Sequence, residues 1–96
     1  MINKIKENIF QLCFREFGSC VYLLKLDKNI LIDTGSKDNE FELLEDLKEI
    51  GLDVKDIGIV ILTHSHYDHN GNVELFSDAE IYDYDNRYIW NFRSFL

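Results

Sequence analysis

The feature that most constrains this chain is an unbroken apolar run that ends in a cluster of histidines. Residues 57–62 are Ile-Gly-Ile-Val-Ile-Leu, and Thr-His-Ser-His-Tyr-Asp-His-Asn-Gly follows at 63–71. A continuous apolar run of this length predicts a buried strand covered on both faces. Clustered imidazoles and an aspartate at the end of a strand are typical of a metal site, because both groups are favoured ligands of zinc and related divalent ions.

The bulk properties favour one small globular domain spanning residues 1–96, of which 46% are hydrophobic. The formal net charge of −8 repels phosphate backbones, so we expect no nucleic-acid partner. No apolar stretch approaches the roughly 18–20 residues that cross a bilayer, and no signal peptide is visible at the N-terminus. These observations predict a cytoplasmic protein without a membrane partner.

The two cysteines, Cys13 and Cys20, lie on either side of residues 15–18, Arg-Glu-Phe-Gly. If that segment is a hairpin turn, the two side chains could face each other across two strands. We expect instead that both are reduced and buried as small hydrophobic side chains.

Alternating apolar residues predict a strand over residues 8–15, and two more apolar runs predict strands over 20–26 and 30–32. Short turns between them favour an antiparallel meander. A short helix is expected over 73–76 and a further strand over 80–84. The tail, 87–96, is too rich in aromatic residues to lie free in water, and Trp90 and Phe92 are expected to be buried or interfacial.

One longer helix is expected between the third and fourth strands. Asn39 can cap it, with Glu42 as the reciprocal partner in a capping box, and Gly51 terminates it. Its apolar stripe at helical spacing predicts a core-facing side, formed by Phe41, Leu43, Leu44, Leu47 and Ile50.

The donor groups of the histidine cluster have a spacing that suits metal binding. His64 and His66 are two residues apart, so both side chains can turn the same way. Asp68 and His69 are adjacent and can present to a second point nearby. The four donors can serve one crowded ion or two ions, which in two-metal hydrolases lie roughly 3.5–4 Å apart.

Residues 63–71 match the T-H-x-H-x-D-H-x-G signature of the metallo-β-lactamase superfamily, which the chain therefore resembles. The resemblance extends upstream through Val-Tyr-Leu-Leu at 21–24 and Asn-Ile-Leu-Ile-Asp-Thr-Gly at 29–35, and it covers about residues 8–85. It implies an α/β (α+β) fold: one half of an αββα sandwich, with a mostly antiparallel sheet and a helix on one face.

The resemblance also implies a role for each donor. His64 and His66 would bind a first metal, and Asp68 and His69 a second, with Asp68 also orienting the bridging hydroxide as the catalytic residue. Asp33, in the D-T-G turn, would steady the metal loop, although a turn aspartate can also simply bond its own backbone.

The chemistry implied by the resemblance is hydrolysis of a small-molecule ester, lactone or thioester by a metal-activated hydroxide. The implied cofactor is zinc, with two ions in a complete site and iron or manganese as alternatives.

The ligand set is incomplete by the same comparison. No histidine follows His69, so the first metal has two histidines where a catalytic zinc takes three protein ligands. Three explanations stay open: the N-terminal part of a longer enzyme, a half-size enzyme, or an inactive degenerate module with a metal-binding or interaction role. A half-size enzyme would be completed by a second copy of itself or by a complementing C-terminal half.

Overall fold

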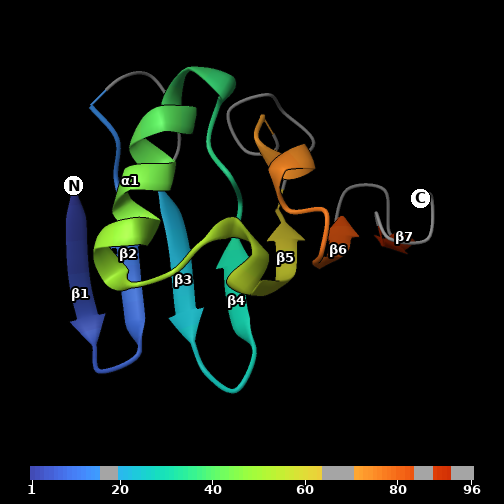
Figure 1. Cartoon of the computed structure of the whole chain (residues 1–96), viewed down its shortest axis with the longest axis horizontal. Coiled ribbons are helices and arrows are strands. Elements are labelled where there is room, and N and C mark those ends of the chain that lie inside the picture. Colours follow the sequence, from blue (N-terminus) through green and yellow to red (C-terminus); the bar gives the residue numbers. More distant parts are fainter. Residues whose placement is uncertain (16–19, 64–70, 84–87, 92–96) are drawn as a thin grey trace.

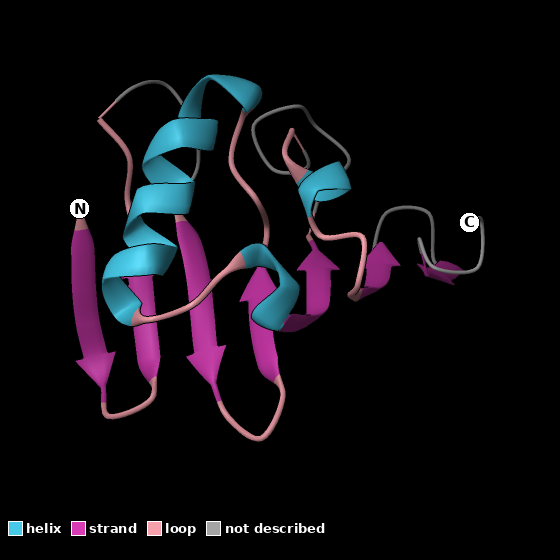
Figure 2. Ribbon diagram, in the orientation of Figure 1, coloured by secondary structure: helices cyan, strands magenta, loops and turns pink. Residues whose placement is uncertain are grey.

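The computed structural model describes residues 1–15, 20–63, 71–83 and 88–91. In this part of the chain, seven strands form one sheet in the order β1-β2-β3-β4-β5-β6-β7. Helix α1 (Glu40–Ile50) lies on one side of the sheet, in front of the N-terminal strands in Figure 1. Figure 2 shows the same arrangement by element type. The expected fold class, a mostly antiparallel sheet with a helix on one face, is confirmed.

The strands are β1 (Ile2–Lys6), β2 (Ile9–Leu12), β3 (Val21–Lys25), β4 (Asn29–Ile32), β5 (Ile57–Leu62), β6 (Glu80–Asp83) and β7 (Tyr88–Asn91). The helical elements are the α-helix α1 (Glu40–Ile50) and three short 3-10 turns, η1 (Lys37–Asn39), η2 (Val54–Asp56) and η3 (Val73–Leu75).

Strands β1 to β4 form an antiparallel meander, whereas β5 lies parallel to both β4 and β6. The predicted three-strand meander is confirmed and gains β1, which the sequence interpretation left without an assignment. Strand β1 lies at the edge of the sheet and is mostly exposed, so it has no strong apolar alternation to reveal it. A parallel neighbour needs a long crossover, and α1 lies within the one that joins β4 to β5.

The core lies between the sheet and α1. Leu23, Leu31, Val60 and Ile81 are register partners across β3, β4, β5 and β6, and all four are fully buried. The other buried apolar residues are Leu12, Val21, Leu43, Leu47, Ile57, Leu62, Phe76 and Ala79.

Strand β5 has the predicted bounds, but it is fully buried on one face only. Ile59 and Ile61 alternate with the buried Val60 and Leu62, and they are half-buried. No described helix covers the face of the sheet on which they lie. In the described residues, the predicted burial of both faces of β5 is therefore complete only on the face toward α1.

The helix ends as predicted at Gly51, which has a left-handed φ of 98°. Its buried side differs from the prediction, because Phe41 is 73% exposed. At about 100° per residue, Phe41 lies roughly 160° around the helix axis from Leu43. The core-facing stripe is therefore centred on Leu43 and Leu47, and Asp46 lies on the same side.

The predicted capping box between Asn39 and Glu42 is wrong. Asn39 is the N-cap residue, but its side-chain oxygen accepts hydrogen bonds from the backbone nitrogen and hydroxyl of Ser36. The box therefore belongs to η1, one turn earlier. The Glu42 carboxylate instead accepts hydrogen bonds from the backbone nitrogen of Arg15 at 3.1 Å and from the ammonium group of Met1 at 3.3 Å.

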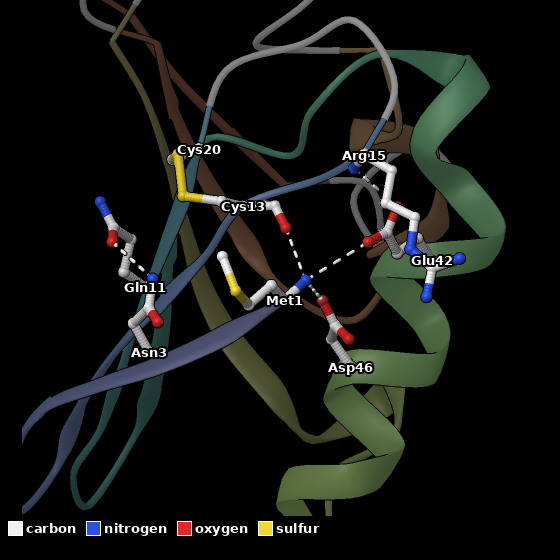
Figure 3. A network of polar contacts seen from close by, with 8 residues as sticks. All are labelled: Met1, Asn3, Gln11, Cys13, Arg15, Cys20, Glu42 and Asp46. Carbon is white, nitrogen blue, oxygen red and sulfur yellow. Dashed lines mark hydrogen bonds and ion pairs between the residues drawn. A yellow bond between two sulfur atoms is a disulfide. The ribbon is translucent and has the colours of Figure 1, made fainter.

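These Met1 contacts help attach α1 to the edge of the sheet, as Figure 3 shows. The Met1 ammonium also donates to the backbone oxygen of Cys13 at 2.6 Å and lies 3.6 Å from an oxygen of Asp46. Burial raises the pKa of Asp46, and the nearby ammonium opposes this effect.

The expectation of two reduced cysteines is also wrong, because Cys13 and Cys20 form a disulfide (Figure 3). Leu12 and Val21 are register partners in β2 and β3, so the next positions outward face each other with their Cα atoms 4.4 Å apart. The alternative that the sequence left open, two cysteines facing each other across paired strands, is the one adopted.

In the described residues, no helix has the length and apolar character that crossing a membrane requires.

Truncation of two residues of the same helix tests the position of its buried face. We expect Leu47→Ala to lower the free energy of unfolding by about 2–5 kcal/mol, because it leaves a cavity in the core. The matched change Phe41→Ala should stay within about 0.5 kcal/mol, as for an exposed side chain. Urea unfolding followed by circular dichroism measures both values, and equal losses would contradict the assignment of the stripe.

Removal of the disulfide tests the link between β2 and β3. Closing a loop of this short length is worth about 2–3 kcal/mol in the chain-entropy account. We expect the double variant Cys13→Ser/Cys20→Ser to lose about that much in urea unfolding. Reductant should lower the wild-type midpoint to that of the double variant and leave the variant unchanged. A wild-type midpoint that is indifferent to reductant would show that the bond is absent.

Candidate metal centre

The candidate site lies at the end of the sheet where β4 and β5 finish. Because these strands are parallel, their carboxyl ends meet at the same edge. The backbone nitrogen of Asp33 donates to the backbone oxygen of Ile61 at 2.8 Å, which extends the pairing one residue beyond β4. The four-residue segment that follows, Asp33–Ser36, is called the D-T-G-S turn below.

The carboxylate of Asp33 connects this turn to the residue after β5. One oxygen accepts the backbone N–H of Thr63 at 2.8 Å, and the other accepts the Thr63 hydroxyl at 2.7 Å. Asp33 is 5% exposed and has a left-handed φ of 66°. Aspartate is one of the few residues with a side chain that adopts this conformation readily. These bonds cross 30 positions of sequence, so Asp33 does more than bond its own turn.

A second set of bonds attaches the same turn to residues 71 and 72. The side-chain amide of the fully buried Asn72 donates to the backbone oxygens of Thr34 at 2.9 Å and Ser36 at 2.7 Å. The backbone nitrogen of Asn72 donates to the Thr34 hydroxyl at 3.1 Å, and that of Gly71 donates to the Gly35 backbone oxygen at 3.0 Å. Thr63 and Gly71, which flank residues 64–70, are thus both bonded to the D-T-G-S turn.

Glycine is required within this turn for steric reasons. Gly35 has a φ of 75°, and a Cβ atom placed on it would lie 2.9 Å from Cε2 of Phe14. The ring of Phe14 therefore packs directly against the turn backbone, and a side chain at position 35 would force the two apart.

An ion-pair group lies beside the turn. The Lys37 ammonium lies 2.6 Å from a carboxylate oxygen of Glu40 and 3.5 Å from one of Glu74. Its hydrogen bond to Glu40 raises the pKa of Lys37, and Glu74 adds to this effect. The contact with Glu74 adds an exposed link between η1 and η3, although exposed pairs of this kind contribute little to stability.

Of the predicted site residues, Asp33 is described, and it contacts the residue that precedes His64. The predicted ligands His64, His66, Asp68 and His69 lie outside the described residues, so their arrangement remains a prediction. Within the ranges that the structure describes, no group of three or more His, Cys, Asp or Glu side chains is placed to hold a metal ion.

Sequence reasoning missed Asn72, Thr34 and Ser36. The Asn-Gly-Asn sequence at 70–72 indicated a turn, and the D-T-G-S segment indicated another. Nothing in either pattern indicated that the two turns bond each other, because their pairing depends on the parallel placement of β4 and β5.

The fold is thus an α/β sheet in which the residues on either side of 64–70, directly after the buried strand β5, are bonded to one turn. The family model of the metallo-beta-lactamase superfamily matches residues 14–84, and the chain belongs to this superfamily.

Individual relatives agree with this assignment over part of their length. The chain is 43% identical over 53 residues to a “probable metallo-hydrolase” of Methanocaldococcus jannaschii, covering 55% of this chain and 26% of that protein. It is 41% identical over 68 residues to metallo-beta-lactamase domain-containing protein 1 of Xenopus laevis, covering 71% and 29%.

Among solved structures, a subclass B3 metallo-beta-lactamase of Bradyrhizobium japonicum matches with a TM-score of 0.73 and 25% identity. That match covers 83% of this chain and 31% of the other. The chain thus spans about a quarter to a third of the length of these relatives.

A double-mutant cycle tests the bond between Asp33 and Thr63. We expect Asp33→Ala to lower the free energy of unfolding by about 2–4 kcal/mol, since it removes an ionised acceptor of two hydrogen bonds. Thr63→Val removes only the hydroxyl and should cost about 1–2 kcal/mol. The two losses should fall short of additivity by about 1 kcal/mol or more in the double variant. Additive losses in urea unfolding would show that the two side chains do not interact.

Proposed function

We propose that this chain is the metal-binding part of a metal-dependent hydrolase that acts on a small-molecule ester, lactone or thioester. The observation that carries the proposal is the attachment of both flanks of residues 64–70 to one buried turn. A segment with four donor groups gains affinity for an ion when its ends are held, because less conformational entropy is lost on binding.

The donor set fits a zinc centre in its chemistry. His64 and His66 would hold a first ion, while Asp68 and His69 would hold a second. Asp33 would keep the start of this segment in place through Thr63. Imidazole and carboxylate ligands also suit iron and manganese. A bound zinc ion lowers the pKa of water to about 7 and polarises a substrate carbonyl group. Within the chain, Asp68 would orient the attacking water.

The charge of the chain bears on the substrate class. A formal net charge of −8 repels polyanions such as RNA. Esters, lactones and thioesters carry little or no charge at the reacting carbonyl, so the field of the protein does not exclude them. This argument supports a small-molecule substrate.

A second candidate is a chain that is inactive alone and acts with a partner. The supporting observation is the half-buried apolar face of the sheet, which includes Ile32, Ile59 and Ile61. A second copy of the chain or a complementing C-terminal half could cover this face and supply the missing ligands. A non-catalytic module that binds metal or a protein through this surface is the third alternative.

Metal analysis tests the proposed ligands. We expect wild-type protein, loaded with zinc and desalted, to retain one or two zinc ions per chain. His66→Ala and Asp68→Asn should each lose at least half of the bound zinc. The matched control Asp27→Asn also removes one carboxylate, but at the exposed turn between β3 and β4, and it should retain wild-type zinc.

Elemental analysis of the same samples, together with thermal unfolding with and without zinc, gives the measurement. A metal that binds the folded chain stabilises it by about 2.7 kcal/mol at 100 times its dissociation constant. Wild-type protein that retains no zinc and shows no stabilisation would refute the hydrolase proposal and favour the interaction module. Ester or lactone hydrolysis that appears only after a C-terminal half is added would favour the completed enzyme.

A further inference from the structure

We propose that Asn72 is a positioning residue for metal binding: its side-chain amide fixes the C-terminal flank of the ligand segment to the D-T-G-S turn. The inference rests on the proposed function, since it assumes that residues 64–70 hold the metal. It assigns to Asn72 a role matching the one expected for Asp33 at the other flank.

The side chain of Asn72 joins two backbone groups of a single turn. Its two amide hydrogens go to two carbonyl oxygens of one turn, those of Thr34 and Ser36, at 2.9 and 2.7 Å. Its own backbone nitrogen bonds the Thr34 hydroxyl. Asn72 is fully excluded from solvent, and Thr34 and Ser36 are buried as well. Buried amide-to-carbonyl bonds of this kind hold a loop firmly, because breaking one leaves a polar group without water.

The donor chemistry of this position selects asparagine. Two donors on a short stem are needed to reach two carbonyl oxygens at once. Aspartate at this position would place a carboxylate oxygen against the two carbonyl oxygens. Alanine would leave the two carbonyl oxygens without the amide hydrogens that Asn72 donates.

The oxygen of the Asn72 side chain lowers the stability of the folded chain, and the bonds made by its two amide hydrogens offset this loss. In the described part of the chain, the side-chain oxygen of Asn72 is buried without a hydrogen-bond partner. A buried acceptor left unsatisfied costs about 1–3 kcal/mol, so a purely packing role would favour an apolar residue of similar size.

The place of these bonds in the fold indicates that Asn72 positions the ligand segment and does not simply stabilise the fold. They lie beyond the ends of β4 and β5, and they join two loops rather than two strands. Asp33 holds Thr63, and Asn72 holds the chain just after Gly71, so the two residues act on opposite flanks of the same segment. Partners that hydrogen-bond metal ligands directly typically change metal affinity about 10–100-fold when removed, and we expect an effect of that order for a residue that holds the flank of the ligand segment.

Zinc affinity, measured by competition with a chromophoric chelator, tests the inference. We expect Asn72→Ala and Asn72→Asp to bind zinc about 10–100-fold more weakly than wild-type protein. The matched control is Asn29→Ala, which removes an amide-to-carbonyl bond to Asp56, 3.0 Å long, at the opposite end of β4. This control should bind zinc within about twofold of the wild type.

A second readout separates positioning from a structural role. Cobalt(II) bound in place of zinc has visible absorption bands that depend on coordination geometry. We expect Asn72→Ala to change these bands and Asn29→Ala to leave them as in the wild type. If metal-free Asn72→Ala is unfolded, Asn72→Ser replaces it, since serine keeps a small polar side chain but has a single donor for the two carbonyl oxygens, and it should weaken zinc binding several-fold.

The outcomes separate the inference from the proposed function. Wild-type zinc binding that a folded Asn72→Ala or Asn72→Ser variant retains within twofold, with unchanged cobalt bands, would overturn the role of Asn72 and leave the metal site standing. A wild-type chain that binds no zinc would overturn both.

Discussion

The pair of hydrogen bonds from the Asp33 carboxylate to Thr63 is the contact on which the candidate site depends. It joins the ends of two parallel strands that α1 and its connections separate by a long stretch of sequence. Parallel pairing alone brings the strand ends to the same edge, but it does not determine how the chain leaves that edge. The Asp33 carboxylate determines the path of the chain beyond β5, because its two short bonds hold the N–H and the hydroxyl of Thr63 at once.

Much of the fold could be predicted from residue patterns, because those patterns report burial. The apolar run at 57–62 has the bounds of β5, and Gly51 marks the end of α1. The errors have physical causes. The exposed side of α1 includes Phe41, so an aromatic residue at helical spacing was misassigned to the core. Strand β1 is exposed at an edge, so it has little apolar signal. The disulfide follows from strand register, which a single sequence does not reveal.

The residue types of the candidate site could be predicted from the sequence, but the hydrogen bonds that hold its flanks in place could not. The donor groups follow one another in sequence, so local spacing is enough to propose a metal centre. The bonds of Asp33 and Asn72 span 30 to 38 positions of the sequence and arise only when β4 and β5 lie side by side. A small polar turn and an Asn-Gly-Asn sequence each predict a local bend. Neither contains information about its partner, and tertiary structure supplies that information.

Two features of the chain meet at strand β5. The predicted ligand set gives a first metal two histidines, where a catalytic zinc usually has three protein ligands, and the predicted ligands directly follow β5. In the described residues, no helix covers the half-buried apolar face that includes Ile59 and Ile61, also on β5. Strands advance about 3.3 Å per residue, so Ile61 lies within about 10 Å of the point where the ligand segment leaves the sheet. A polypeptide that covered this face would lie within reach of the proposed metal centre, so cover for the apolar face and a further ligand could come from one source.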